Sequence, residues 1–340
     1  MLRSNSSTFK PLNNVAQAGL KNVSEAFPKP PFCSVMIPTY NPAPHQLEQA
    51  LESVLSQDCG AEAMQIEIVD DCSPDVDVQQ LVRSAAGDRV RFSQTTRNMG
   101  LAGCWNTCIE RARGEWVHIL HQDDYVLPGF YAEIENIAES HPEIGLIAVR
   151  SFYVDDEGVI DALTPRIKDL EEGGNNVAEL FYLNQIECPG VAVRRRAYLK
   201  HGEFRLDLCY TLDWEMWTRI IGLEGGVVSS KVLACYRMAS GNATSRLART
   251  GQTLVDIARL HMLFAQRYKD FNPRNANRKL CDLALKQAWI FHIMNDPEGE
   301  QASLRFWRRH APLRAKARRY GGVFLRGLDS FSSRIRKSPT

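Results

Sequence analysis

Apolar and polar positions follow two different periods along the first 140 residues. Continuous apolar runs bounded by turn residues predict buried strands, whereas apolar residues spaced three and four apart predict helices. Strands are predicted at 33–38, 66–71, 89–93 and 115–120, and helices at 46–55, 76–86 and 98–113. This alternation is typical of an α/β fold built on a doubly wound, mainly parallel sheet.

The pattern changes after residue 144. A hairpin is predicted at 151–160, helices at 175–184 and 211–223, a strand at 226–237, and helices from about 248 to 320 with breaks at Pro273, Pro297 and Pro312. We therefore expect three parts. Residues 1–31 form a flexible N-terminal segment, 32–245 form a folded domain with halves 32–140 and 141–245, and 246–340 form a helical, basic C-terminal extension.

The net charge of +1 hides an uneven distribution. The last forty residues, 301–340, contain eleven Lys or Arg and one acid, so this segment carries +10 and the rest of the chain −9. Aromatic residues interleave with these cations, as in 305–309, which favours a helix on an anionic membrane surface. Docking of the basic tail on the acidic body is an alternative. No recognition motif accompanies the charge, so no nucleic-acid partner is expected.

The cysteines and the chain ends bear on location. Nine cysteines without any Cys-x-x-Cys exclude a disulfide framework and a zinc site, and they predict a reducing, cytoplasmic compartment. Residues 1–31 contain no secretory signal, and no apolar run reaches the roughly 18 residues that span a bilayer. The inner face of the membrane is the alternative location, through the basic tail.

Adjacent carboxylates follow the apolar strand that ends near Leu120. Ligands of open α/β sheets bind at the carboxyl ends of the strands, and hard oxygen ligands suit Mg²⁺ or Mn²⁺. Asp123 and Asp124 are therefore candidate ligands for a metal that also holds phosphate. The alternative is a loop in which an Asp caps the helix after Pro128.

Three further turns fall at the same predicted edge of the sheet. Tyr40, in the turn Pro38-Thr39-Tyr40, could stack on a base; Asp71 is placed to hold a ribose or base; and Arg97 and Asn98 precede a helix start that favours a diphosphate. Each turn also has a purely structural interpretation as ordinary turn or capping chemistry.

A later helix begins with acids beside aromatic residues. Asp213 and Glu215 are candidate bases, because Trp214 and Trp217 could desolvate a carboxylate and raise its basicity. Aromatic faces also suit sugar rings. The alternative is a capping Asp with both Trp side chains in the core.

Four segments in order resemble the family 2 glycosyltransferases, which have the GT-A fold. They are Ser34-Val-Met-Ile-Pro-Thr-Tyr-Asn, Glu67-Ile-Val-Asp-Asp-Cys-Ser, Arg97-Asn-Met-Gly-Leu-Ala-Gly-Cys-Trp-Asn and Gly114-Glu-Trp-Val-His-Ile-Leu-His-Gln-Asp-Asp. Order and spacing match across 33–140 and more loosely to about 245. The ordered set is specific, although each segment alone is not.

This resemblance implies inverting transfer from a nucleotide-diphospho-sugar with a divalent metal, Mg²⁺ or Mn²⁺. The base of the donor is expected to be uracil, with guanine or thymine as alternatives. The implied acceptor is a glycan or a lipid-linked molecule. The implied setting is the synthesis of bacterial surface polysaccharides. The implied roles are donor binding by Pro38, Thr39, Tyr40, Asp71, Arg97, Asn98 and Asp123, metal binding by Asp124, catalysis by Asp213, and acceptor binding by Trp214 and Glu215.

The sequence departs from the family pattern in three places. His121 replaces the first Asp of the acidic motif, Leu212 replaces a Glu that often precedes the base, and a His that often follows the last strand is missing. Arg237 is expected to contact the diphosphate instead. Two rival functions remain at this stage, a sugar nucleotidyltransferase and a non-catalytic nucleotide-sugar or glycan-binding protein. The first strand is not followed by the Gly-rich, basic loop that is typical of nucleotidyltransferases, which counts against that function.

Overall fold

The computed structural model describes residues 30–238 and 243–312. Most of the predicted N-terminal segment and the basic tail from 313 onwards lie outside these residues. The first half has the predicted alternation of strands and helices: β1 (Cys33–Thr39), α1 (Pro44–Leu55), β2 (Met64–Asp70), α2 (Val78–Ala86), β3 (Arg91–Gln94), α3 (Gly100–Arg111) and β4 (Trp116–Ile119).

Local chemistry accounts for these elements. All seven residues of β1 are buried, as a strand covered on both faces requires. Pro44 lies in the first turn of α1, where its missing N–H leaves no helical bond unmade. Asp77 caps α2 by accepting a hydrogen bond from the Gln80 N–H at 2.9 Å.

The second half adds short strands and turns to the same sheet. Its elements are β5 (Tyr125–Val126), α4 (Phe130–Ser140), β6 (Leu146–Val154), β7 (Ile160–Leu163), η1 (Lys168–Leu170), η2 (Ala178–Leu180), η3 (Cys188–Gly190), β8 (Val191–Arg194), α5 (Arg195–His201), α6 (Leu212–Glu224) and β9 (Gly226–Arg237). The predicted hairpin is confirmed as β6 and β7. The predicted helix at 175–184 is wrong, because only the single turn η2 forms there.

The sheet is mixed rather than mainly parallel. Its strand order is β3-β2-β1-β4-β8-β6-β9-β5, with β7 beside β6. The pairs among β1 to β4 are parallel, as predicted, but β4 pairs antiparallel with β8, and β8 antiparallel with β6. The short strands β5 and β8 gave no periodic signal, so the sequence did not predict this reversal of direction.

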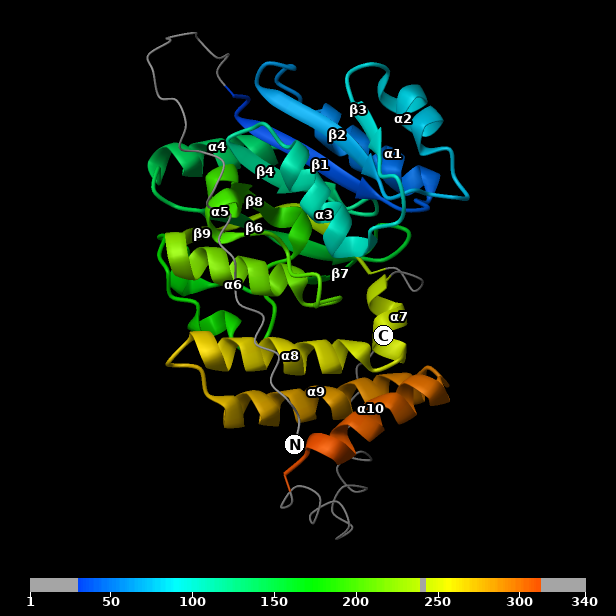
Figure 1. The fold of residues 1–340 in the computed structure, drawn as a ribbon, viewed down its shortest axis with the longest axis vertical. Helices are drawn as coiled ribbons and strands as arrows, with labels where there is room; N and C mark the ends of the chain where they lie inside the picture. The colour runs from blue at the N-terminus through cyan, green and yellow to red at the C-terminus, as the bar shows by residue number, and fades with distance from the viewer. Residues whose placement is uncertain (1–29, 239–242, 313–340) are drawn as a thin grey trace, which may run out of the picture.

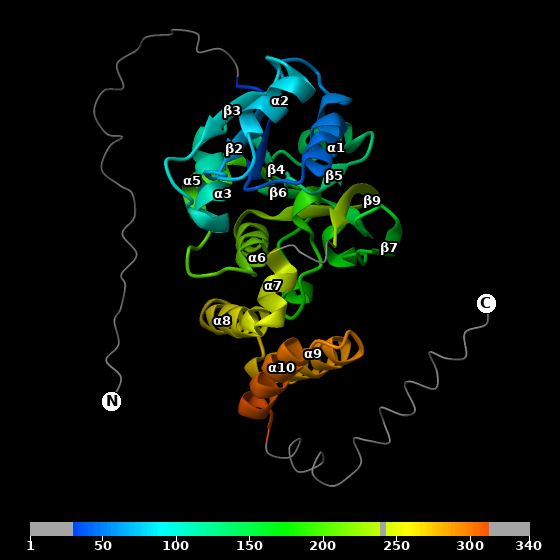
Figure 2. The same ribbon diagram turned by 90° about the vertical axis from the view of Figure 1, so that its right-hand side faces the viewer.

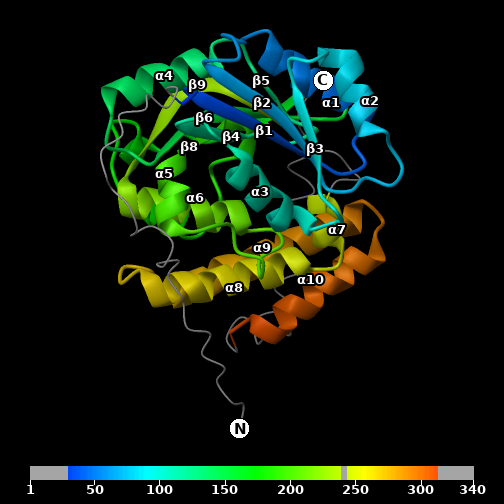
Figure 3. The same ribbon diagram turned by 45° about the horizontal axis from the view of Figure 1, so that its top comes forward.

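Two layers of helices cover the sheet (Figures 1 and 3). Side chains of α1, α2 and α4 form one core with one face of β1, whereas α3 and α6 pack against the other face. The C-terminal extension continues this second layer with α7 (Ala243–Arg249), α8 (Gln252–Arg267), α9 (Pro273–Ile293) and α10 (Pro297–His310). Leu254, Leu260 and Phe264 of α8 belong to the same core as α6, so the extension is packed onto the domain (Figure 2).

Candidate active site

Buried Asp70 joins the carboxyl ends of the first three strands. Its carboxylate accepts hydrogen bonds from Thr39 Oγ1 at 3.1 Å, from the Ser73 N–H at 3.0 Å and from Gln94 Nε2 at 2.8 Å. Because these donors lie on or beside β1, β2 and β3, one side chain aligns the ends of all three strands. Ligands bind at this edge in open α/β sheets.

The neighbouring Asp71 holds the start of α3. Its oxygens accept hydrogen bonds from the Met99 N–H at 2.7 Å and the Gly100 N–H at 2.9 Å, and the residue is 3% exposed. Gly100 has φ +72°, a conformation that favours glycine at this helix start. Asp71 therefore fixes the start of α3. Its direct contact with a base stays a prediction.

The turn after β1 presents one exposed aromatic ring. Pro38 and Thr39 are buried in β1, whereas Tyr40 is 45% exposed. The Tyr40 N–H donates to Gln122 Oε1 at 2.8 Å, and Gln122 Nε2 donates to the Tyr40 carbonyl at 3.3 Å. Gln122 thus fixes the Tyr40 backbone beside the acidic turn, while the ring is free to meet a ligand.

The loop before α3 presents a cation at the same edge. Arg97 and Asn98 are both exposed, and Asn98 Oδ1 accepts from the Gly100 N–H at 2.9 Å. Within the part of the chain that the structure describes, no side-chain partner of the Arg97 guanidinium is found. A cation beside a helix N-terminus suits an anionic group.

Three potential metal ligands lie together in the turn between β4 and β5. One ligand atom each of His121, Asp123 and Asp124 lies within 4.8 Å of the others. Strand β4 ends at Ile119, one residue before the predicted end, and the acids follow it in this turn, as expected. Burial and the neighbouring Asp124 raise the pKa of Asp123 to about 6.

A buried carboxylate oxygen without a hydrogen-bond donor in the described part of the chain makes this group suitable for a cation. Asp124 is 1% exposed, and its Oδ1 accepts from the Arg237 N–H at 2.8 Å. Its Oδ2 lies 3.1 Å from His121 Nδ1, and among the described residues it accepts no hydrogen bond of good geometry. Buried carboxylate oxygens normally have partners. Two carboxylates with one imidazole suit Mn²⁺ better than Mg²⁺, which prefers oxygen ligands.

Arg237 supports the acidic turn instead of facing the site. The side chain is 2% exposed, and Nε donates to the Asp123 carbonyl at 2.9 Å. The other nitrogens donate to the Asp155 and Asp156 carbonyls, both at 2.8 Å, and to Gln49 Oε1 at 2.6 Å. The expected contact with a diphosphate is therefore wrong, because the guanidinium is buried among protein acceptors.

Asp213 is a half-buried carboxyl at the start of α6. It accepts hydrogen bonds from the Trp214 N–H at 2.6 Å and from Asn184 Nδ2 at 3.2 Å. Burial raises the pKa of Asp213 to about 6, and nearby His121 opposes that rise. Because the charge of His121 acts on Asp213, the predicted base lies near the candidate metal ligands.

The two residues after Asp213 turn away from this site. Trp214 is 3% exposed, and its Nε1 donates to the Leu180 carbonyl. Glu215 pairs with Arg219 at 2.9 Å inside the protein. Both were expected to contact the acceptor, and this expectation is wrong because helical geometry points their side chains into the core.

Glu187 was missed by sequence reasoning. It precedes η3 and accepts a hydrogen bond from the Tyr153 hydroxyl at 2.7 Å. Burial raises its pKa to about 7, and the charges of Asp213 and Asp124 contribute to the rise. Glu187 therefore faces the same site from a third segment. No periodic or spacing signal marked it, because its neighbours in space are distant in the sequence.

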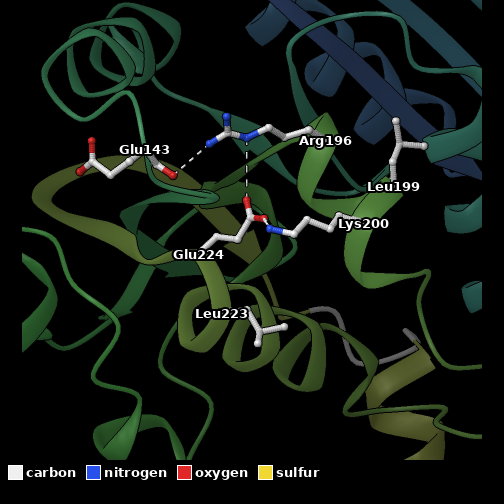
Figure 4. Close-up of a pocket in the computed structure, with 6 residues that line it drawn as sticks. All are labelled: Glu143, Arg196, Leu199, Lys200, Leu223 and Glu224. Carbon is white, nitrogen blue, oxygen red and sulfur yellow. Dashed lines mark hydrogen bonds and ion pairs between the residues drawn. The ribbon is translucent and has the colours of Figure 1, made fainter.

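A pocket of about 630 Å³ lies elsewhere, between α5 and the end of α6 (Figure 4). It is lined by Glu143, Arg196, Leu199, Lys200, Leu223 and Glu224. Glu224 is paired with Lys200 at 2.9 Å and lies 3.9 Å from Arg196. Because these charges neutralise one another and the acidic turn does not contribute, we do not connect this pocket with the site.

Comparison with known proteins shows which proteins this chain resembles. Residues 34–202 match the family model described as glycosyl transferase family 2. The uncharacterized protein MT1568 of Mycobacterium tuberculosis (strain CDC 1551 / Oshkosh) is 28% identical over 245 residues, which is 68% of this chain and 75% of MT1568.

Solved structures establish the fold. The mannosyltransferase PcManGT of Pyrobaculum calidifontis, in complex with GDP-Man and Mn²⁺, superposes with a TM-score of 0.54 at 21% identity, covering 90% of this chain and 84% of that chain. S. aureus TarS 1–349 in complex with UDP-GlcNAc gives 0.52 at 17% identity, covering 82% and 91%. The chain thus has a GT-A-like α/β fold.

TarS is also similar in sequence, over a shorter stretch. The protein named poly(ribitol-phosphate) beta-N-acetylglucosaminyltransferase TarS, from Staphylococcus aureus (strain Mu50 / ATCC 700699), is 32% identical over 94 residues. These residues are 27% of this chain and 16% of TarS.

Proposed function

We propose that this protein is an inverting glycosyltransferase that moves a sugar from a nucleotide-diphospho-sugar to an acceptor hydroxyl. The observation that carries the proposal is the meeting of Asp213 with the His121, Asp123 and Asp124 group at the ligand edge of a GT-A-like sheet. The match to the family model supports it, as do the complexes of TarS with UDP-GlcNAc and of PcManGT with GDP-Man. We infer a UDP-linked donor from the resemblance, with a GDP-linked donor as the alternative.

The donor would lie along the strand ends. The exposed Tyr40 ring is placed to stack on the base, and exposed Arg97 and Asn98 are placed near the diphosphate or the ribose. Asp124 and His121 would hold Mg²⁺ or Mn²⁺, with Asp123 as a further ligand or a partner of the ribose. A divalent cation supplies positive charge that stabilises the leaving diphosphate.

Asp213 acts as the general base in this proposal. With a pKa of about 6 the carboxyl is mostly ionised at pH 7, yet it is basic enough to take a proton from the acceptor hydroxyl. The hydroxyl oxygen then attacks the anomeric carbon while the bond to the diphosphate breaks. One displacement inverts the anomeric configuration. The Asn184 amide orients the carboxylate through its 3.2 Å hydrogen bond.

We further propose that the acceptor is a glycan or lipid-linked polymer of the bacterial surface. The TarS name, which contains poly(ribitol-phosphate), supports this setting. The cations of α10, Arg305, Arg308 and Arg309, belong to the predicted basic, membrane-facing tail, and they are the part of it that the structure describes. In the described residues, no helix is both long and apolar enough to cross a bilayer.

A thermal-shift screen tests the proposal directly. UDP-, GDP- and dTDP-sugars are added with and without Mn²⁺, because a ligand at 100 times its Kd stabilises by about 2.7 kcal/mol. We expect one nucleotide class to raise the melting temperature, and Mn²⁺ to increase the rise. Release of nucleoside diphosphate from that donor then measures turnover. A folded sample that responds to no nucleotide-sugar would contradict the proposal.

A further inference from the structure

The position of Asp213 depends on the first turn of α6. Asp213 is the second residue of this helix, and Thr211 is its N-cap. N-cap hydroxyls usually accept a hydrogen bond from the helix that they start, but the Thr211 side chain makes no such bond. The start of α6 therefore needs another anchor.

Asp256 of α8 supplies this anchor from the C-terminal extension. A single oxygen, Oδ2, accepts hydrogen bonds from the backbone N–H groups of Cys209 at 3.2 Å, Tyr210 at 2.9 Å and Thr211 at 2.8 Å. It also accepts from the Thr211 hydroxyl at 3.0 Å. Asp256 is 1% exposed, and hydrogen bonds to a buried carboxylate are roughly twice as strong as neutral ones.

Other contacts hold α8 in register with the same segment. The Arg259 guanidinium donates to the Asp207 carbonyl, and the Tyr268 hydroxyl donates to the Thr218 carbonyl of α6 at 3.1 Å. Phe264 packs its ring against Trp214 at a centroid distance of 6.3 Å. Figures 1 and 2 show α8 lying along α6.

We propose that Asp256 is a positioning residue for glycosyl transfer, through which the C-terminal extension fixes the catalytic base. This inference rests on the proposed function, because it takes Asp213 as the base. Three backbone donors and one hydroxyl that converge on one carboxylate restrict the chain from Cys209 to the start of α6. Loss of this restraint displaces Asp213, and a displacement of about 1 Å can cost on the order of 10²-fold in rate.

The first test compares two Asp→Asn variants in the full chain. Asp256→Asn should lower kcat for nucleoside diphosphate release by about 10- to 10²-fold and leave the nucleotide-induced thermal shift unchanged. Asp296→Asn is the matched control, because Asp296 also caps a helix of the extension, accepting from the Gly299 N–H at 3.2 Å, but lies at the start of α10. It should change kcat less than twofold. An equal loss of kcat in both variants would overturn the inference, because it would reflect general destabilisation.

A double-mutant cycle tests whether Asp256 acts through Asp213. Residues that act as a unit are non-additive, so adding Asp256→Asn to Asp213→Asn should change the residual rate less than twofold. The same 10- to 10²-fold loss in both backgrounds would overturn the inference, since Asp256 would then act independently of the base.

Amide hydrogen exchange provides a readout that needs no activity. In Asp256→Asn, exchange at residues 209–213 should rise about tenfold or more, and it should not rise in Asp296→Asn. Unchanged exchange in Asp256→Asn would overturn this inference alone. A wild-type protein that turns over no nucleotide-sugar, with exchange rising as expected, would instead refute the proposed function and with it the catalytic meaning of the anchor.

Discussion

The guanidinium of Arg237 donates from Nε to the backbone carbonyl of Asp123 at 2.9 Å, so the end of β9 supports the acidic turn. This contact and the one from the Arg237 N–H to Asp124 join segments more than 110 residues apart. The positions of the candidate metal ligands Asp123 and Asp124 are therefore set partly from outside the segment that carries them.

Replacement of this side chain should affect folding before donor binding. Arg237→Ala removes the donor to the carbonyl oxygens of Asp123, Asp155 and Asp156, and we expect a loss of about 2–4 kcal/mol in the free energy of unfolding. Urea denaturation measures the loss, and titration with Mn²⁺ should show weaker binding by the folded variant. A variant with unchanged stability and a selective loss of donor affinity would instead support a contact with the diphosphate.

Removal of the Asp213 carboxylate should lower the rate of turnover and increase the stability of the protein. Asp213→Asn should lower kcat by about 10²- to 10⁴-fold while donor binding remains. Because the folded-state pKa of about 6 lies above the ordinary value of 3.8, Asp213 contributes stability that is present below pH 3.8 and lost as the pH rises through 6.

The Asn variant keeps this contribution at every pH. In the metal-free protein it should therefore be more stable than the wild type at pH 7–8, by about 2–3 kcal/mol, and about equally stable near pH 3. Thermal unfolding across this range measures the difference. A variant less stable than the wild type at pH 8 would refute the raised pKa, and an unchanged kcat would refute the role of Asp213 as base.

The rate should also report the ionisation of the base. Only the carboxylate form accepts a proton, so kcat should rise about tenfold per pH unit below pH 6 and level off above it. The residual rate of Asp213→Asn should lack this step. A wild-type rate that is flat between pH 5 and 7 would assign proton removal to a different group.

Metal preference should follow the identity of residue 121. Asp124→Asn should remove the Mn²⁺-dependent part of the nucleotide-induced thermal shift. His121→Asp should increase the effectiveness of Mg²⁺ relative to Mn²⁺, because an imidazole ligand is replaced by a hard oxygen ligand. Rates with each metal over a concentration series measure the ratio. A ratio that does not change would show that residue 121 does not bind the metal.

Loss of the carboxylate at Glu215 should not affect binding of the acceptor. Glu215→Gln weakens the buried pair with Arg219, with an expected loss of about 2–3 kcal/mol in the free energy of unfolding. The KM for the acceptor should be unchanged, because the side chain faces the core. A raised KM with normal stability would restore the sequence-based expectation.

The predicted site residues whose positions the structure brings near one another share one property. Asp123, Asp124 and Asp213 each occur in a local pattern, either the end of an apolar run or the start of an amphipathic helix. The position of a residue within a strand or helix determines at which edge of the sheet, or at which end of the helix, the residue lies. The parallel half of the sheet was predictable for the same reason, since each strand was long and apolar.

The roles that were wrong or missed depend on contacts between distant segments. Arg237 reaches Gln49, which is 188 positions away, and Asp256 anchors a loop more than 40 positions before it. An isolated Arg or Asp carries no local sign of such partners. The side-chain directions of Trp214 and Glu215 depend on how α6 packs between the sheet and α8, which periodicity alone did not determine.

Thiol labelling can measure how often the loop before α6 detaches from Asp256. Cys209, whose N–H is bound by Asp256, has a half-buried thiol, and burial raises the pKa of this thiol. We therefore expect Cys209 to react slowly with a thiol reagent while Asp256 holds the loop, and exposed Cys59 provides a reference rate in the same molecule. The labelling rate of Cys209 relative to that of Cys59 therefore reports how often the loop before α6 detaches from Asp256.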